Sequence, residues 1–230
     1  MKILAIETSC EHASVALLID DEAVERRLEG HVNHSERLLP TLRELLADAQ
    51  VTLAALDGIA FGAGPGAFTG VRLACGVAQG LAMGADLGVV PVCSLAALAL
   101  QGRGEKVLTL TDARMGEVYS AAYQLQSGVL TQLQPPACTP PQAVSMPPGE
   151  HWFAIGSALP AYETTLRAAL GARACGWDGE AVARAGAVAH LAAQGVLRGA
   201  LVAPELAAPL YVRDKVALTT AERLARGGRA

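Results

Sequence analysis

Apolar residues recur along this chain with two different periods, and the changes of period predict an alternation of strands and helices. Short apolar runs bounded by turn residues predict strands at residues 2–7, 14–19, 59–62, 88–92, 106–112, 118–124 and 152–156. Apolar residues spaced three and four apart predict helices at residues 35–50, 68–84 and 178–196, with Asp178 capping the last, and a short helix over 214–230. This order of elements is typical of an α/β fold.

The chain also repeats itself. Residues 2–8 align with residues 106–112, and both segments are strands that end at or near a carboxylate, Glu7 or Asp112. Each is followed by a short polar turn, a second β-rich run and, later, an apolar strand, a glycine and a helix. This internal duplication predicts two similar α/β halves that face each other.

We place the first half at residues 1–100 and the second half at 101–213. The closing helix, about 214–230, is expected to pack back on the first half. The segment 134–149 carries six prolines, so we expect an irregular loop or spacer there.

A glycine-dense turn at residues 62–72 joins a predicted strand to a predicted helix. Four glycines in this turn would let backbone amides approach an anion. However, a Walker loop needs Lys and then Ser or Thr after its last glycine, where this chain has Val71 and Arg72. The Rossmann spacing is nominally met, but its acid, Asp86, comes before the next strand rather than at its end. A structural tight turn is therefore the favoured interpretation.

Three glycines, Gly76, Gly80 and Gly84, fall four residues apart in the predicted helix that follows. They form one stripe, and each costs about 1 kcal/mol relative to alanine inside a helix. Charged residues such as Arg72 and Asp86 keep the apolar runs shorter than the ~18 residues of a membrane span. We therefore expect this helix to pack very closely on another helix of its own half or on a partner chain. The leucine stripe of helix 35–50 is its natural mate.

Composition narrows the function classes. The 230 residues are 52% hydrophobic and 17% charged, as in compact soluble proteins. With a net charge of −4, the chain lacks the excess of basic residues that dominates binding to nucleic acids. Another subunit must therefore supply much of any contact with a nucleic acid. The five cysteines are odd in number and include no Cys-x-x-Cys pair, which argues against a disulfide framework and a zinc site. No signal peptide is recognisable at the start, so we expect a cytoplasmic protein.

Several motifs together resemble the TsaB family, also called YeaZ. They are Ile6-Glu7-Thr8-Ser9, His34-Ser35-Glu36-Arg37-Leu38-Leu39-Pro40, Gly64-Pro65-Gly66-Ala67-Phe68-Thr69-Gly70-Val71-Arg72 and Asp112-Ala113-Arg114-Met115-Gly116-Glu117-Val118-Tyr119. The resemblance spans nearly the whole chain, including Tyr211-Val212-Arg213 near its end. Jointly, these motifs are highly specific.

The resemblance implies a duplicated actin-like fold of the sugar-kinase and heat-shock ATPase class. It also implies a dimerisation subunit of the machinery that places threonylcarbamoyl on adenosine 37 of tRNAs reading codons that begin with A. Members of the family pair with the catalytic paralogue TsaD, and the ATPase TsaE joins them. They also form homodimers through the same surface. We accordingly expect contact with tRNA only through the complex, no membrane association, no tightly bound cofactor, and ATP or ADP only in the assembled complex.

The family pairs through two helices that correspond here to residues 35–50 and 68–84, in agreement with the leucine and glycine stripes. The residues expected at this partner surface are Leu38, Leu42, Leu45, Leu46, Leu73, Gly76, Val77, Gly80, Met83 and Gly84.

The chain lacks the phosphate-binding hairpins of an active actin-like ATPase. Such hairpins read Asp-x-Gly-Thr or similar, whereas the corresponding segments here are Glu7-Thr8-Ser9-Cys10 and Asp112-Ala113-Arg114-Met115. Because neither has the required glycine, phosphate binding is compromised. Residues that could retain a nucleotide or partner contact are Glu7, Thr8, Ser9, Asp112 and Arg114. We predict a non-catalytic scaffold with no catalytic residue of its own.

Two enzymatic alternatives remain open. A nucleotide-dependent kinase or ATPase would use Glu7 and Asp112, and a peptidase would use Cys10 or His34. His31 and His34 lie three residues apart but have no third ligand placed by the sequence, so we expect no metal site.

Overall fold

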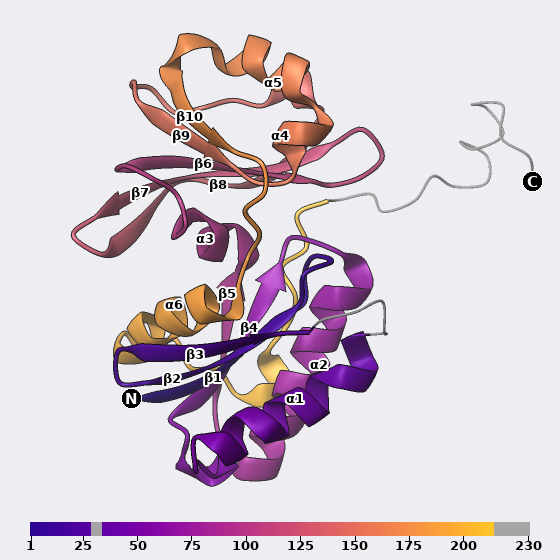
Figure 1. The fold of residues 1–230 in the computed structure, drawn as a ribbon, viewed down its shortest axis with the longest axis vertical. Helices are drawn as coiled ribbons and strands as arrows, with labels where there is room; N and C mark the ends of the chain where they lie inside the picture. The colour runs from indigo at the N-terminus through magenta and orange to yellow at the C-terminus, as the bar shows by residue number, and fades with distance from the viewer. Residues whose placement is uncertain (29–33, 214–230) are drawn as a thin grey trace, which may run out of the picture.

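The computed structural model describes residues 1–28 and 34–213, which form two five-stranded sheets with helices around them (Figure 1). The predicted helix at 214–230 and the residue His31 lie outside these ranges. No helix in the described part of the chain is both long enough and apolar enough to cross a membrane.

The predicted strands and the helices at 35–50 and 68–84 occur in the predicted order, together with further elements that were not predicted. The first half contains β1 (Lys2–Glu7), β2 (Ser14–Ile19), β3 (Glu22–Arg27), α1 (His34–Asp48), η1 (Leu53–Ala55), β4 (Gly58–Gly64), α2 (Phe68–Ala85), β5 (Val89–Cys93) and α3 (Ser94–Ala99). The second half contains β6 (Lys106–Asp112), β7 (Val118–Gln126), β8 (Val129–Thr139), η2 (Pro141–Ala143), β9 (Trp152–Ile155), α4 (Ala158–Ala161), α5 (Glu163–Leu170), η3 (Gly171–Arg173) and β10 (Ala174–Asp178). They are followed by α6 (Ala185–Leu197) and η4 (Pro204–Leu206).

The two sheets have the same topology, which confirms the predicted duplication. The strand order is β3-β2-β1-β4-β5 in the first sheet and, in the corresponding direction, β8-β7-β6-β9-β10 in the second. In both sheets the first strand of the half pairs antiparallel with the second strand and parallel with the fourth. The chain therefore has the predicted fold class, a duplicated actin-like fold with two similar α/β halves.

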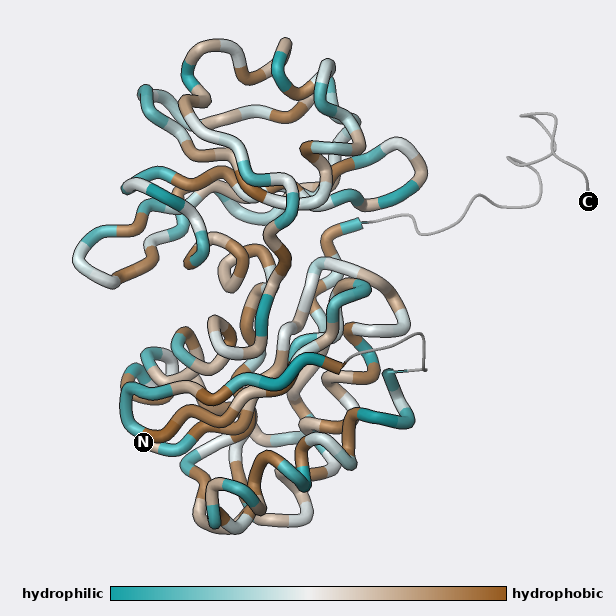
Figure 2. The backbone as a smooth tube through the Cα atoms, viewed as in Figure 1, coloured by the Kyte–Doolittle hydropathy of each residue, from teal (hydrophilic) through white to brown (hydrophobic). Residues whose placement is uncertain are grey.

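Strand β1 lies in the middle of the first sheet, and its residues face two separate helical layers. Leu4 and Ile6 pack with side chains of α1 and α2, whereas Ile3 and Ala5 pack with side chains of α6. All four are fully buried. Because both faces of the strand are covered, its sequence is a continuous apolar run rather than an alternating one. Figure 2 shows the resulting hydrophobic layer in the lower half of the molecule.

Each half places its last helix against the sheet of the other half. Helix α3 follows β5, yet Leu95 and Leu98 pack with Val107 and Tyr123 of the second sheet. Helix α6 follows β10, yet Val188 packs in the core of the first sheet (Figure 1). The boundary predicted for the second half, at 101–213, differs from the structure in this respect, because the apolar face of a helix does not encode which sheet it will cover.

The proline-rich segment is partly regular, contrary to the prediction of an irregular loop over 134–149. Its first residues complete β8, which is an edge strand of the second sheet. An edge strand has one unpaired side, so it tolerates Pro135 and Pro136, which have no N–H to donate. The register with β7 shifts where these two prolines lie, between the pairs Ser120–Ala137 and Ala122–Gln134.

Asp178 does not cap a helix, contrary to the prediction. It ends β10, and its Oδ1 accepts hydrogen bonds from the backbone N–H groups of Glu180 and Ala181, each at 3.1 Å. These bonds close a turn, and α6 begins only at Ala185. Asp residues favour both turns and helix starts, so the sequence pattern alone did not separate the two.

Candidate functional site

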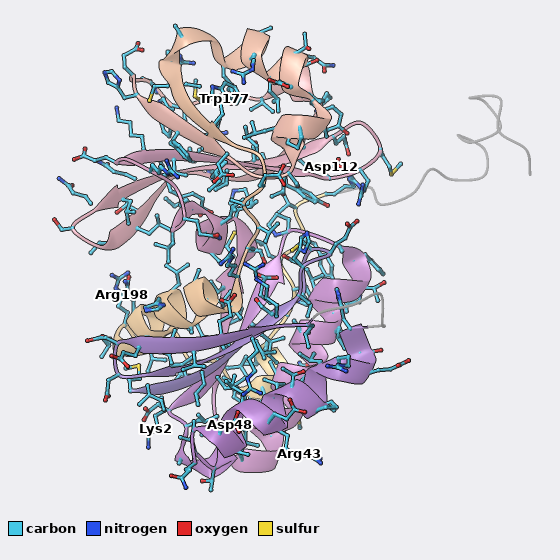
Figure 3. The ribbon with its side chains drawn as sticks, in the orientation of Figure 1. Lys2, Arg43, Asp48, Asp112, Trp177 and Arg198 are labelled. Carbon is cyan, nitrogen blue, oxygen red and sulfur yellow. The ribbon has the colours of Figure 1, made fainter. Side chains whose placement is uncertain are left out.

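The polar turns that follow β1 and β6 meet at a cleft between the two halves. The cleft has a volume of about 690 Å³, which lies within the ~300–1,000 Å³ typical of small-molecule sites. Its walls include residues 9–12 of the first half, 111–115 of the second half, and the returning segment 210–213. Figure 3 shows Asp112 at the edge of the second half that faces the first. The duplication has thus brought its two polar turns to one place.

Glu7 lies beneath this cleft rather than in it. Its side chain is fully buried, Oε1 accepts a hydrogen bond of 2.7 Å from the backbone N–H of Ser9, and Oε2 accepts one of 2.8 Å from the Ser94 hydroxyl. The Ser94 hydroxyl oxygen accepts in turn from the backbone N–H of Gly64 at 3.2 Å. Burial raises the pKa of Glu7, and these hydrogen bonds oppose part of that rise. Neither Glu7 nor Thr8 lines the cleft, so the suggested nucleotide contact is not available to them there.

The raised pKa of Glu7 makes the stability of the protein depend on pH. Above the ordinary value of 4.5, the unfolded chain loses the proton that folded Glu7 retains. The free energy of unfolding therefore falls as pH rises, until the pH exceeds the pKa that Glu7 has in the folded protein. Replacing Glu7 with Gln keeps the shape but removes the titration. We expect the free energy of unfolding of Glu7→Gln, relative to the natural chain, to increase as pH rises from about 4.5 through that window.

Urea unfolding at a series of pH values measures this difference. The matched control is Glu22→Gln, which makes the same chemical change at an exposed position on the edge strand β3. A difference between Glu7→Gln and the natural chain that stays constant with pH would contradict the prediction.

The glycine-dense turn at 62–72 makes room for the end of β1. A Cβ added to Gly70 would lie 1.8 Å from the carbonyl oxygen of Thr8, and one added to Gly66 would lie 2.4 Å from that of Ser9. The Thr8 hydroxyl also donates a hydrogen bond of 2.7 Å to the Gly70 carbonyl. These glycines therefore allow two backbones to pack together, in agreement with the structural interpretation of the turn.

The same turn lacks the geometry of a dinucleotide site. Asp86, the acid at Rossmann spacing, ends α2 in the left-handed conformation (φ 55°) and precedes β5. Pro65 has no N–H to offer an anion, and the N–H of Ala67 is donated to the carbonyl of Ser9 at 2.7 Å. Two positions of the turn are thus unable to bind phosphate through their amides.

On the opposite wall, Asp112 and Arg114 form a small polar network. Asp112 Oδ1 accepts from the Arg114 backbone N–H at 2.9 Å and from the Tyr162 hydroxyl at 3.2 Å, and Oδ2 lies 3.3 Å from the Arg114 guanidinium. Arg114 also forms an ion pair of 2.9 Å with Glu11 of the first half. This pair joins the two halves across the cleft, but both side chains are largely exposed, so it contributes little to stability.

Arg213, in the returning segment, makes a second set of polar contacts at the cleft and was not among the predicted site residues. It forms an ion pair of 2.6 Å with Glu117, donates to the Ala113 carbonyl at 2.9 Å, and lies over the Tyr119 ring at 5.8 Å. The only signal in the sequence was its place in the motif Tyr211-Val212-Arg213. Nothing in the sequence placed that motif beside the turn after β6, about 100 residues earlier.

The cleft offers no evident hydrolytic machinery. Burial raises the pKa of the Cys10 thiol to about 11, so it stays protonated and weakly nucleophilic near neutral pH. Its sulfur lies 3.7 Å from the backbone carbonyl oxygen of His12, which cannot serve as a general base. Within residues 1–28 and 34–213, no group of three or more His, Cys, Asp or Glu side chains could hold a metal ion. These features do not favour the peptidase interpretation.

The predicted partner surface is only partly exposed. Leu38, Leu42 and Leu45 are buried in the core between α1 and the first sheet, so they cannot meet a partner as predicted. The leucine stripe marks the buried face of α1, and this face packs on the chain's own sheet rather than on the glycine stripe. Leu46, Leu73 and Val77 are partly buried against the same core.

The glycine stripe, in contrast, faces outward along α2. Gly76, Gly80 and Gly84 are exposed, and apart from their chain neighbours and the nearby backbone of α2, no described atom lies within 4 Å of a Cβ added to any of them. Met83, beside them, is 66% exposed. The described parts of the chain therefore leave the stripe uncovered, and its assignment to a partner remains a prediction.

Comparison with known proteins gives consistent matches. Residues 29–220 match the model of the family described as TsaD: tRNA N6-adenosine threonylcarbamoyltransferase. The chain is 37% identical over 230 residues to the tRNA threonylcarbamoyladenosine biosynthesis protein TsaB of Escherichia coli (strain K12), covering 94% of this chain and 96% of that protein. It is also 37% identical to the protein of the same name from Haemophilus influenzae, covering 70% of this chain and 74% of that relative.

Two solved structures have the same fold and similar sequences. One, described as an uncharacterized protein with similarity to peptidase YEAZ from Pseudomonas aeruginosa, superposes with a TM-score of 0.85 and 39% identity, covering 92% of this chain and 99% of the other. The second, YeaZ from Pseudomonas aeruginosa, gives a TM-score of 0.83 and 39% identity, with 91% and 99% of the two chains covered.

Proposed function

The chain belongs to the TsaB (YeaZ) family, and on that premise we propose that it acts in tRNA threonylcarbamoyladenosine biosynthesis as a non-catalytic scaffold. In this proposal it pairs with a TsaD-like catalytic paralogue that transfers threonylcarbamoyl to adenosine 37 of tRNAs reading codons that begin with A. A TsaE-like ATPase joins the pair, and ATP or ADP binds only in the assembled complex. The chain contacts tRNA only through that complex.

The observation that carries the proposal is the uncovered glycine stripe of α2. Three glycines in an 18-residue helix cost about 1 kcal/mol each relative to alanine, and the described chain places nothing against them. A second helix lying on this stripe would approach the α2 backbone closely and offset that cost. Helix α1 lies on the same face of the first sheet (Figure 1), and its exposed Leu39 would extend the contact.

The cleft supports a scaffold rather than a nucleotide-dependent enzyme. Glu7, the acid expected to hold hydrated Mg²⁺ in an active relative, is buried and hydrogen-bonded through both oxygens. Asp112 is bonded to Arg114 and Tyr162 of its own half. Without a glycine in either turn at the phosphate position, the remaining groups lack a cradle for β- and γ-phosphates.

Reconstitution tests the proposal directly. We expect a mixture of tRNA, ATP, the pathway's small-molecule substrates and its other purified protein components to form threonylcarbamoyladenosine only when this chain is present. The modified nucleoside is measured by mass spectrometry after digestion of the tRNA. The isolated chain should show no ATP turnover in the same buffer. Modification at the full rate in its absence would overturn the scaffold role, and ATP hydrolysis by the chain alone would favour the kinase or ATPase alternative.

A further inference from the structure

Arg72 lies over two aromatic rings, Phe68 and Tyr211, that line the cleft. Its guanidinium carbon lies 3.3 Å from the ring centroid of Phe68, one turn earlier in α2, and 4.9 Å from that of Tyr211 in the returning segment. Both rings are about half exposed, at 54% and 56%. Two cation–π contacts from distant parts of the chain therefore fix the position of an exposed cation.

Arg72 differs from the other two arginines near the cleft in its partners. Arg114 is paired with Glu11 and Asp112, and Arg213 is paired with Glu117. Arg72 makes one hydrogen bond, from Nη1 to the backbone carbonyl of Phe68 at 3.1 Å. No carboxylate within residues 1–28 and 34–213 lies within 4.0 Å of its guanidinium.

The Phe68 and Tyr211 rings both lie against the Arg72 guanidinium, and one of its donors is used by the Phe68 carbonyl. The remaining N–H groups lie in the guanidinium plane, in the fork geometry that binds a carboxylate or phosphate through two parallel hydrogen bonds. Because the rings already restrict this side chain, binding an anion would cost less conformational entropy than at a freely rotating arginine.

We propose that Arg72, clamped by Phe68 and Tyr211, is an anchor that binds a carboxylate of the catalytic protein partner. This inference rests on the proposed function, because Arg72 precedes Gly76 by one helical turn, at the head of the exposed glycine stripe. A partner helix on that stripe would lie close to the clamp. The anchor thus fixes the position of the partner along α2.

The surroundings of the clamp favour a protein carboxylate over a tRNA phosphate. Exposed apolar side chains, Met115 at 68% and Leu210 at 40%, lie on the same cleft rim, and arginine beside aromatic and methionine side chains is typical of protein interface centres. The rim also carries Glu11, Asp112 and Glu180, and the whole chain has a net charge of −4. Such a surface repels a polyanionic backbone more strongly than it repels a single carboxylate.

The test compares Arg72→Ala and Arg72→Lys in the full-length chain, with the purified catalytic paralogue and with tRNA as probes. We expect Arg72→Ala to weaken binding of the paralogue by ~30-fold or more, as at an interface hot spot. Arg72→Lys keeps the charge but loses the planar fork, so it should recover only part of this loss. Calorimetry at two salt concentrations, with and without tRNA, gives the dissociation constants.

The matched control is Arg198→Ala, at the exposed end of α6 (Figure 3), which should bind like the natural chain. Thermal unfolding of each variant checks that the fold is intact. Binding of the paralogue by Arg72→Ala within twofold of the natural chain would overturn the anchor while leaving the scaffold proposal in place. A loss seen only with tRNA would overturn it in favour of a phosphate contact. Failure of the natural chain itself to bind the paralogue would remove both proposals.

Discussion

Replacing Gly80 with leucine should abolish pairing with the catalytic paralogue and leave the isolated chain folded. Gly80 lies in the middle of the exposed stripe, and nothing lies within 4 Å of a Cβ added there. A leucine side chain therefore fits the isolated chain, where it replaces a residue that costs α2 about 1 kcal/mol relative to alanine. In the complex it would occupy the space that the partner backbone needs. Co-elution in size-exclusion chromatography measures the pairing.

The matched control for Gly80→Leu is Ala168→Leu. Ala168 is an exposed helical residue on α5 in the second half. Its replacement therefore adds the same apolar side chain away from the proposed surface. The control should pair normally. Light scattering of Gly80→Leu alone also tests the homodimer, which should dissociate if it uses the same helices. Co-elution of Gly80→Leu with the paralogue, as for the natural chain, would remove the stripe from the interface.

A second large effect is expected at Gly70, only six residues before Gly76 in the same helix. A Cβ at Gly70 would lie 1.8 Å from the backbone carbonyl oxygen of Thr8, which no side-chain rotation can relieve. We expect Gly70→Ala to lower the free energy of unfolding by about 3 kcal/mol or more, because β1 or α2 must move. Gly76→Ala meets nothing within 4 Å, so it should raise the free energy of unfolding by about 1 kcal/mol.

Urea unfolding followed by circular dichroism compares these two alanine variants with the natural chain. Opposite signs for the same chemical change would separate the two uses of glycine in α2, one for contact within the chain and one for an open surface. Equal effects at the two positions would mean that the close approach at Gly70 does not constrain the fold. A loss of stability in Gly76→Ala would show that the stripe is covered in the isolated chain.

The strands could be predicted closely because their signal is local. β1, β2 and β6 are bounded by polar turns and have buried side chains on both faces, so short apolar runs mark their ends. The duplication of the two halves was equally visible, since each repeats a strand, an acid and a turn. Three strands, β3, β8 and β10, were missed, and all three lie at sheet edges. For proline-bearing β8, the edge position that makes the prolines tolerable depends on the tertiary fold.

The candidate site was harder to predict because its contacts join distant segments. The leucine stripe of α1 identified a buried face but not the sheet that buries it, so Leu38, Leu42 and Leu45 were assigned to a partner. The glycine stripe was predicted to pack closely on another helix or on a partner chain, and in the structure it is exposed and available for such a contact. The Arg72 clamp depends on Tyr211, about 140 residues further along the chain, and no local pattern links the two.

The exchange of α3 and α6 between the halves has a consequence for synthesis on the ribosome. When α3 has emerged, the face of β1 that carries Ile3 and Ala5 still lacks most of its helical cover, because α6 begins at Ala185. At ~5–20 residues per second, the intervening residues take roughly 4–17 seconds to translate. During that interval the nascent N-terminal layer exposes apolar surface, which is when a chaperone would bind it and when a stalled chain would aggregate.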